Sequence, residues 1–181
     1  MPGSFLHPRK YGHVDRCPCS LRNSPDATYR NAGEDDISLI LEFIKKLADY
    51  EGRLDEVTAT EEDLSRWIFD EGIAEVIFVL EDGKEVGFAL FYKAFSTYIA
   101  KINIHLEDMF VEPAYRGKGY GKGLMKEIAK IIIERGYGRF EWTAVSWNEP
   151  AIDFYLSIGA EQMDWELFHL DGDDLKKLAD L

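Results

Sequence analysis

Apolar residues recur along the chain with two different spacings, which predict where helices and strands lie. From Ile37 to Tyr50 they return every three or four positions, the period of an amphipathic helix. Thr60 and Asp63, three positions apart, predict the capped start of a shorter helix. A second long helix, closing at Gly136, is predicted by a stripe made of Leu124, Met125, Ile128, Ile131 and Ile132.

The remaining segments alternate or form short apolar runs, as strands do. Residues 74–80 and 86–91 predict a β-hairpin because an Asp-Gly pair lies between them. Further strands are predicted at residues 28–30, 102–111, 140–145 and 164–170. Short helices are predicted from Glu149 and from about Asp173. Helices combined with an antiparallel hairpin and a later strand–helix–strand unit predict an α/β domain with a mixed sheet.

Residues 1–27 differ from the rest of the chain. They show no periodicity, contain four prolines and lack the continuous apolar run of a signal peptide. We predict an appendage, an expression tag or an over-extended start, before a single domain over residues 28–181, since 181 residues suit one domain. Cys17 and Cys19 lie in this appendage and have no second pair to complete a zinc site, so they predict neither a metal site nor a disulfide framework.

The domain itself is strongly acidic. The formal net charge is −13, and residues 1–27 carry four basic and two acidic side chains, which leaves −15 on the rest. Such a field repels nucleic acid and attracts cations, although acidity also serves solubility alone. No apolar run approaches the roughly 20 residues that span a bilayer. The low number of cysteines suits a reducing compartment, so we expect a cytoplasmic protein. From the charge we expect it to bind a small cationic molecule and no nucleic acid, and from the short apolar runs we expect no membrane insertion.

A glycine-rich run, Tyr-Arg-Gly-Lys-Gly-Tyr-Gly-Lys-Gly at residues 115–123, lies between a predicted strand and a predicted helix. At such a junction main-chain N–H groups converge on anions, and alternate glycines allow close approach and positive φ. Arg116 and Lys122 add positive charge, so the loop predicts a phosphate-bearing ligand. A P-loop is excluded because a glycine follows Lys122, and a dinucleotide fingerprint because Lys122 stands where its last glycine belongs. A glycine-rich turn without a ligand is the alternative.

Arg116-x-x-Gly119-x-Gly121 is the pyrophosphate motif of the GNAT N-acetyltransferases, which the chain resembles from Tyr29 to Leu181. Within that superfamily the chain is most similar to the diamine (spermidine/spermine) N-acetyltransferases. This closer similarity is carried by Leu-Ala-Asp-Tyr-Glu at 47–51, Leu-Glu-Asp-Met-Phe-Val at 106–111 and Trp-Asn-Glu-Pro-Ala-Ile-Asp-Phe-Tyr at 147–155.

The resemblance implies a GNAT fold, with a mixed, mostly antiparallel central sheet flanked by helices. The strand around residues 107–111 is implied to splay from the strand around 140–145, so that acetyl-CoA lies in a V-shaped opening between the two. No metal is implied. The implied cofactor-binding residues are Met109, Phe110, Val111, Arg116, Gly117, Lys118, Gly119, Tyr120, Gly121, Lys122 and Asn148.

Acetyl transfer to an amine needs a route for the amine's proton, because an alkyl ammonium has a pKa near 10.4. Glu107 and Asp108 are adjacent, and strand alternation sends them to opposite faces unless a bulge intervenes. The resemblance implies Glu107 as the catalytic base, with Asp108 as the second candidate, and a purely structural role for Asp108 stays open.

The leaving thiolate of coenzyme A, whose conjugate acid has a pKa of about 8.5, needs a proton donor. The resemblance implies that Tyr155 is this catalytic acid and that the amine attacks directly in a ternary complex. Tyr155 follows Asn148 by about two helical turns, so the two share a face if the helix is regular from Asn148 onward.

The acceptor is less closely defined by the resemblance than the cofactor. The residues implied to bind it are Tyr50, Glu51, Glu107 and Asp108. Tyr98 and His105 depart from the family pattern, in which other aromatic residues are usual, so the acceptor is predicted as a polyamine, a diamine or a thialysine-like amine. A GNAT enzyme acting on an amino acid or a peptide N-terminus, and a non-catalytic acyl-CoA-binding module, are the alternatives. Relatives usually dimerise, so a homodimer is expected.

Overall fold

A computed structural model describes residues 27–181, so Cys17, Cys19 and the predicted appendage up to residue 26 lie outside the described residues. The strands are β1 (Ala27–Asn31), β2 (Ala74–Glu81), β3 (Lys84–Ser96), β4 (Lys101–Val111) and β5 (Phe140–Trp142). The helices are α1 (Ile37–Tyr50), α2 (Glu61–Ser65), α3 (Tyr120–Glu134), α4 (Glu149–Ser157) and α5 (Gly172–Ala179). Among these described helices, none is long and apolar enough to cross a membrane.

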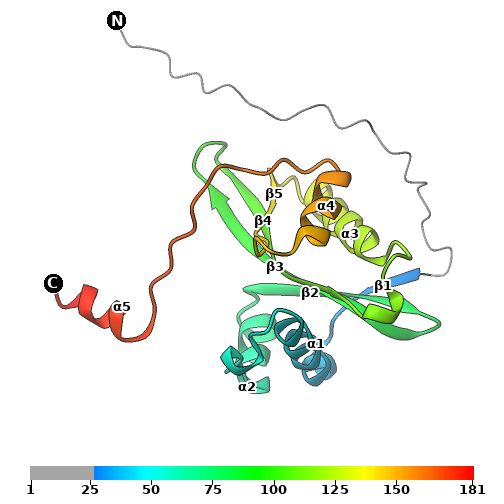
Figure 1. Cartoon of the computed structure of the whole chain (residues 1–181), viewed down its shortest axis with the longest axis horizontal. Helices are drawn as coiled ribbons and strands as arrows, with labels where there is room; N and C mark the ends of the chain where they lie inside the picture. The colour runs from blue at the N-terminus through cyan, green and yellow to red at the C-terminus, as the bar shows by residue number, and fades with distance from the viewer. Residues whose placement is uncertain (1–26) are drawn as a thin grey trace, which may run out of the picture.

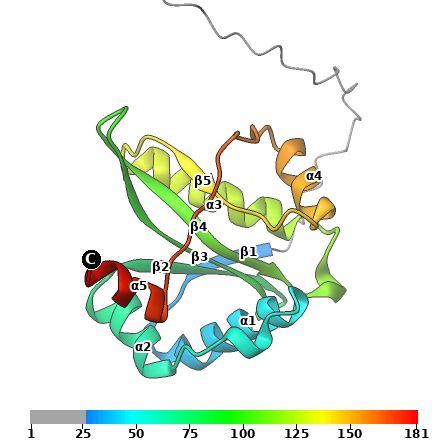
Figure 2. The same cartoon turned by 60° about the vertical axis from the view of Figure 1, so that its left-hand side comes forward.

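One mixed sheet forms the middle layer of the fold. Its strands lie in the order β1-β2-β3-β4-β5, and each neighbouring pair is antiparallel except β4 and β5, which are parallel. Helices α1 and α2 cover one face of the sheet and α3 and α4 the other, as the layered view shows (Figures 1 and 2). The predicted α/β class and the mostly antiparallel mixed sheet are therefore confirmed.

The two helical layers are held by separate apolar clusters. On one face α1 buries Ile40 and Phe43, and the Phe43 ring stacks on Phe88 of β3 at 5.2 Å between ring centroids. On the other face α3 buries Leu124 and Ile128 completely, as the predicted stripe requires. Each such side chain contributes about 1.5–3 kcal/mol relative to its exposed state. The two long predicted helices are confirmed.

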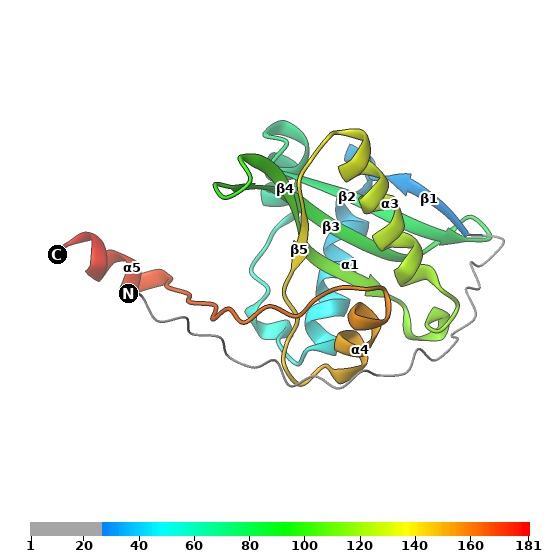
Figure 3. The same ribbon diagram turned by 90° about the horizontal axis from the view of Figure 1, so that it is seen from above.

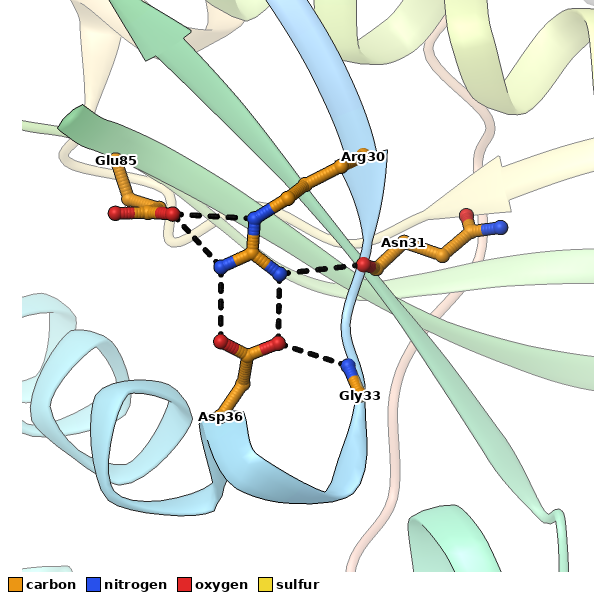
Figure 4. A network of polar contacts seen from close by, with 5 residues as sticks. All are labelled: Arg30, Asn31, Gly33, Asp36 and Glu85. Atoms are coloured by element: carbon orange, nitrogen blue, oxygen red, sulfur yellow. Dashed lines mark hydrogen bonds and ion pairs between the residues drawn. The ribbon is translucent and has the colours of Figure 1, made fainter. Parts of the chain in front are cut away.

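Arg30 joins three elements at the start of the domain (Figure 4). Its guanidinium donates to Asp36 at 2.6 and 2.8 Å and to Glu85 of β3 at 2.7 and 3.1 Å. The Asp36 carboxylate also accepts the Gly33 N–H at 2.8 Å, immediately before α1. Charge-assisted bonds of this kind are roughly twice as strong as neutral ones. Arg30 therefore fixes the entry of α1 to the edge of the sheet.

The β2–β3 hairpin and the start of α2 follow their local sequence signals. Asp82 and Gly83 have φ values of 52° and 78°, which suit the two-residue turn that an Asp-Gly pair favours. Thr60 accepts the Asp63 N–H, and the Asp63 carboxylate accepts from Thr60 in return, so the predicted capping box forms. The segment then continues as a π turn over Arg66–Asp70.

Strands β4 and β5 separate after only three residue pairs. Their pairing runs from Ile104 with Phe140 to Leu106 with Trp142, and β4 then continues to Val111 without β5. This divergence is the predicted V-shaped splay. The prediction that the strand from Phe140 extends to residue 145 was wrong, because β5 ends at Trp142 and residues 143–145 have no pairing with β4.

The predicted strand at residues 164–170 is also wrong. Residues 160–171 carry no regular structure, and the segment runs away from the body of the domain to α5 (Figures 1 and 3). Trp165, Leu167 and Phe168 are 72%, 80% and 89% exposed. A strand forms only beside a partner strand, and none lies beside this segment within residues 27–181. The C-terminal helix forms, from Gly172 onward.

Gly123 on α3 allows β1 to pack closely on that helix, which generates a first prediction. A Cβ atom at Gly123 would lie 1.6 Å from the Tyr29 Oη and 2.5 Å from its Cζ. We expect Gly123→Ala to lower the free energy of unfolding by about 1–3 kcal/mol, measured by urea denaturation, because Tyr29 and β1 must shift.

Gly121 provides the matched control for this substitution. A Cβ atom there would meet only Phe154 Cζ at 3.9 Å and Met109 Cε at 4.0 Å, which is ordinary contact. Because alanine is a better helix former than glycine by about 1 kcal/mol, Gly121→Ala should be at least as stable as the unchanged protein. Equal stability of the two variants would show that the close packing of Tyr29 on α3 is not needed.

Candidate functional site

The loop between β4 and α3 has the backbone shape of an anion site. Gly117 and Gly119 have φ values of 76° and 93°, in the left-handed region that favours glycine. Gly119 is the N-cap of α3 and no side chain caps this helix end. The first N–H groups of a helix point away from the helix body, and they carry the positive end of its dipole. Such an end accepts phosphate.

Gly121, in the first turn of α3, lies opposite β4 and α4. The atoms nearest to a Cβ atom placed at this glycine belong to Met109 of β4 and Phe154 of α4, both at ordinary contact distance. Protein packing alone therefore does not require glycine here.

Main-chain alternation along β4 decides which of its amides face the opening. Glu112 N–H donates to Val86 of β3 at 2.9 Å, so these two residues form a hydrogen-bonded antiparallel pair. By alternation Phe110 also bonds β3, whereas the N–H groups of Met109 and Val111 point away from β3 toward the opening. Sequence reasoning selected all three residues, and the register distinguishes Met109 and Val111 from Phe110.

Arg116 directs its guanidinium toward α1. Its Nε donates to the Val111 carbonyl oxygen at 2.9 Å, and the guanidinium lies over the rings of Tyr50 and Phe110, at 4.6 and 5.3 Å from their centroids. The side chain that was predicted to add charge to the phosphate loop therefore joins the end of β4 to the end of α1. Lys122, by contrast, is exposed on the first turn of α3.

Lys118 and Tyr120, both predicted to bind cofactor, share one partner. Lys118 Nζ donates to the two Glu81 carboxylate oxygens at 2.9 and 3.2 Å, and the Tyr120 hydroxyl donates to the same carboxylate. These donors lower the pKa of Glu81, the Tyr120 bond being the larger cause. Sequence reasoning missed Glu81, because it lies 39 positions before Tyr120 and no local pattern connects the two.

A β-bulge resolves the question of Glu107 and Asp108. Leu90 pairs with Asp108 and Phe91 pairs with Leu106, which leaves Glu107 without a partner on β3. The bulge adds one residue, so strict alternation no longer sends the two carboxylates to opposite faces. Glu107 is exposed, with its carboxylate 3.9 Å from His105 Nε2, and the His105 ring packs on Tyr92 at 5.1 Å.

The charge of Glu51 acts on two other predicted site residues, Asp108 and Tyr155. Burial raises the pKa of Asp108 to about 7, with further contributions from the charges of Glu107 and Glu51. Burial raises the pKa of Tyr155 to about 12, and the charge of Glu51 again adds to it. Glu51 at the end of α1 therefore lies close enough to influence both β4 and α4. The acidic centre formed by Glu51, Glu107 and Asp108 thus includes groups from the end of α1 and from β4, and Tyr155 of α4 lies within reach of its charge.

Helix α4 and the end of α1 meet at Tyr50. The Tyr50 hydroxyl donates to Asn148 Oδ1 at 3.4 Å, and its ring lies 6.1 Å from that of Trp147. Asn148 is the N-cap of α4 and also accepts the Ala151 N–H at 3.3 Å. The helix begins at Glu149, so the condition for a face shared by Asn148 and Tyr155, a helix that is regular from Asn148 onward, is not met at Asn148 itself.

Tyr155 and its surroundings form the wall between α4 and β5. The Tyr155 ring lies 5.1 Å from Trp142, the last residue of β5, and 5.2 Å from Phe154. Sequence reasoning did not single out Trp142. Tyr98, the other departure from the family pattern, is 87% exposed at the tip of the β3–β4 connection. Within the described residues, no group of three or more His, Cys, Asp or Glu side chains is arranged to hold a metal ion.

Comparison with known proteins adds a family match to this geometry. The model of the Acetyltransferase (GNAT) family matches residues 41–160. Thialysine N-epsilon-acetyltransferase of Sus scrofa is 33% identical over 83% of this chain and 95% of its own length. L-ornithine N5-acetyltransferase NATA1 of Arabidopsis thaliana is 39% identical over 56% of this chain and 45% of its own. The solved structure of an integron cassette protein from the mobile metagenome of V. cholerae has a TM-score of 0.71 and 31% identity, and the match covers 85% of this chain and 98% of that one.

The raised pKa of Asp108 generates a prediction for stability against pH. The folded state binds this proton more tightly than the unfolded chain, in which the pKa is about 3.9. Between about pH 4 and pH 7 the folded state therefore holds more protons, and raising the pH lowers the free energy of unfolding through this group. We expect Asp108→Asn, which cannot ionise, to melt at a higher temperature than the unchanged protein at pH 8.

The same comparison at lower pH tests the cause. The gain from Asp108→Asn should shrink as the pH falls from 8 toward 4, because Asp108 is then neutral in the folded protein. Asp49→Asn, at an exposed position of α1, is the control and should give no pH-dependent gain. A gain for Asp108→Asn that is the same at every pH would contradict the assignment.

Proposed function

This chain belongs to the GNAT acetyltransferase family, and from that premise we propose that it transfers the acetyl group of acetyl-CoA to a primary amine of a small cationic acceptor. The observation that carries the proposal is the opening between β4 and β5, which ends at the uncapped start of α3. The names of the relatives, one acting on thialysine and one on L-ornithine, support an acceptor that is a small molecule with an amine-bearing side chain.

The residues around the opening suit acetyl-CoA. The first amides of α3 after Gly119 would hold its diphosphate, with Lys122 nearby, and the outward N–H groups of Met109 and Val111 would pair with its extended arm. Asn148 lies at the other side, at the start of α4. When bound, acetyl-CoA supplies an acetyl group activated as a thioester.

The acidic centre suits a cationic amine. The exposed carboxylate of Glu107 and that of Glu51 attract an ammonium group, and the net charge of the domain strengthens this attraction over a longer range. An ammonium group must lose a proton before it becomes a nucleophile. We assign proton removal to the pair Glu107 and Asp108, of which Asp108, with a pKa of about 7, accepts a proton near neutral pH.

Tyr155 suits the role of proton donor. With a pKa of about 12 its hydroxyl stays protonated at neutral pH, so it donates to the sulfur that departs from the acetyl group. The negative charge of Glu51 contributes to the raised pKa of both Asp108 and Tyr155. A cationic acceptor beside Glu51 offsets that charge, which lowers both pKa values and makes Tyr155 a stronger acid when the acceptor is in place.

We also propose that the chain forms a homodimer. The segment 160–171 exposes large apolar side chains that a stable protein normally covers, and β5 has a strand partner on one side only within the described residues. A second copy of the chain offers both a free β5 edge and an identical apolar segment. The two surfaces can therefore cover one another.

The proposed reaction predicts the release of free thiol from acetyl-CoA. We expect thiol release with thialysine, ornithine and a panel of polyamines, and faster turnover of acceptors that carry a second positive charge, because Glu51 and Glu107 both attract cations. No thiol release with any amine of the panel would contradict the proposed reaction. Release with uncharged primary amines alone would contradict the cationic acceptor.

Tyr155→Phe tests the proton donor within the same assay. We expect kcat to fall by about a hundredfold or more, the usual contribution of general acid catalysis, with little change in thermal stability because the ring is kept. Tyr137→Phe is the matched control, since Tyr137 packs against the same apolar cluster but lies after the end of α3. Equal kcat values for the two variants would remove Tyr155 from the mechanism.

The homodimer is tested by the mass of the protein in solution. Light scattering should give twice the mass of one chain, and a chain that ends at Gly159 should give the mass of a monomer because it lacks the apolar segment. Trp165→Asp with Phe168→Asp is a milder change with the same expected result. A full-length chain that stays monomeric at micromolar concentration, with Trp165 shielded from water, would indicate that the segment folds back on its own domain.

A further inference from the structure

Glu81 is the last residue of β2 and lies beside the candidate phosphate loop. Its side chain is only 22% exposed, and its carboxylate accepts from Lys118 Nζ twice and from the Tyr120 hydroxyl. The ammonium of Lys118 also lies over the Tyr115 ring at 4.9 Å. The strand end and the loop are thus joined by one acidic side chain.

A carboxylate is an unexpected neighbour for an anion site. Its negative charge repels a diphosphate, so it does not serve the ligand by direct attraction. The bond to Lys118 offsets much of that charge, and it also occupies a lysine that the sequence offers for phosphate binding. Lys118 and Glu81 therefore neutralise each other and do not attract an anion. The ion pair instead acts on the backbone conformation of the loop.

The two partners of Glu81 stand on either side of Gly119. That glycine has a φ of 93°, and without a side chain it is free to adopt many other backbone conformations. Holding residues 118 and 120 at one fixed point limits the rotation of the peptide groups between them. Those are the peptide groups whose N–H direction at the start of α3 decides whether an anion is bound.

Glu81, to which Lys118 and Tyr120 are bonded, is itself held in place by the sheet. Glu81 pairs with Lys84 across the tight turn and with Ala27 of β1, so both neighbours of β2 hold it in place. Tyr120 is 1% exposed and its ring lies in the apolar cluster under α3. The hydrogen bond between Tyr120 and Glu81 therefore connects the first residue of α3, which lies in the core, with the end of β2.

We propose that Glu81 is a positioning residue for the phosphate loop: it holds Lys118 and Tyr120 so that the amides at the start of α3 are already directed at the diphosphate before the cofactor binds. This inference rests on the proposed use of acetyl-CoA. It adds a residue outside the loop on which that binding depends. A loop that is ordered in advance loses less entropy when it binds its ligand.

Glu81→Ala tests the proposal, with Glu75→Ala as a matched control. Glu75 lies near the other end of β2 and forms an ion pair with Arg135 just after α3, far from the phosphate loop. Both variants therefore lose an ion pair between the same strand and the two ends of the same helix. We expect the Kd for coenzyme A, measured by calorimetry, to rise about tenfold for Glu81→Ala and to stay within about twofold for Glu75→Ala.

A truncated cofactor separates positioning from general damage. Acetyl-pantetheine carries the thioester and the arm but no diphosphate, so it does not use the phosphate loop. We expect Glu81→Ala to raise the KM for acetyl-CoA with little change in kcat or in the amine KM. With acetyl-pantetheine the variant and the unchanged protein should be equally active. A variant that loses the same factor with both cofactors would overturn the proposal.

Two milder variants keep the test decisive if Glu81→Ala folds poorly. Glu81→Gln keeps an acceptor for the Tyr120 hydroxyl and should recover most of the affinity, whereas Tyr120→Phe keeps the buried ring and should lose affinity as Glu81→Ala does. Unchanged affinity for coenzyme A in both Glu81→Ala and Tyr120→Phe would overturn the proposal. Tighter binding by Glu81→Ala would also overturn it, because it would show that the carboxylate only repels the ligand. If the unchanged protein bound no coenzyme A at all, the proposed function itself would fail, which is a different result.

Discussion

The site depends on the point at which β4 and β5 stop pairing. Past Leu106 and Trp142 the ladder ends, yet β4 continues to Val111, so main-chain N–H groups in the middle of the domain are left facing an opening. Buried N–H groups need partners, and a missing strand is a place for an extended ligand that can supply acceptors. The same separation gives α4 room to begin at Glu149 on the far side and brings Tyr155 against the end of β5. A sheet that stayed paired would close this opening.

Charge is arranged on two scales in this molecule. Over a long range the acidic chain attracts cations and repels anions, which favours the proposed cationic acceptor and disfavours the polyanionic coenzyme of the proposed reaction. In the proposed site this repulsion of the coenzyme would be offset by main-chain amides at the start of α3, whose partial charges do not depend on basic side chains. Two of the three basic residues of the loop at residues 115–123 bond within the protein, Arg116 to Val111 and Lys118 to Glu81. The candidate phosphate site is therefore built mainly from backbone, and its geometry matters more than its side-chain charge.

Local patterns were sufficient to predict the elements whose stability is local. The helices at Ile37–Tyr50 and Tyr120–Glu134, the Asp-Gly turn and the capping box at Thr60 all form, because periodicity, turn residues and caps act over a few positions. Features set by distant contacts were not predictable in the same way. The register shift that places Glu107 on a bulge, the Glu81 contact with the loop and the direction of Arg116 join residues far apart in sequence. The chosen residues Glu51, Asp108 and Tyr155 do come together, but the resemblance selected them, and periodicity alone could not have done so.

Residues 164–170 have the alternating apolar pattern of a strand but do not form one. The apolar residues are real, and burying Trp165, Leu167 and Phe168 would contribute several kcal/mol in total, at about 1.5–3 kcal/mol for each large side chain. No surface within residues 27–181 covers them. An alternating segment of this kind normally has a partner strand, and in the proposed homodimer a second copy of the chain would supply it. A local pattern thus indicates a segment that is able to pair, and whether a strand forms depends on a strand edge beside it.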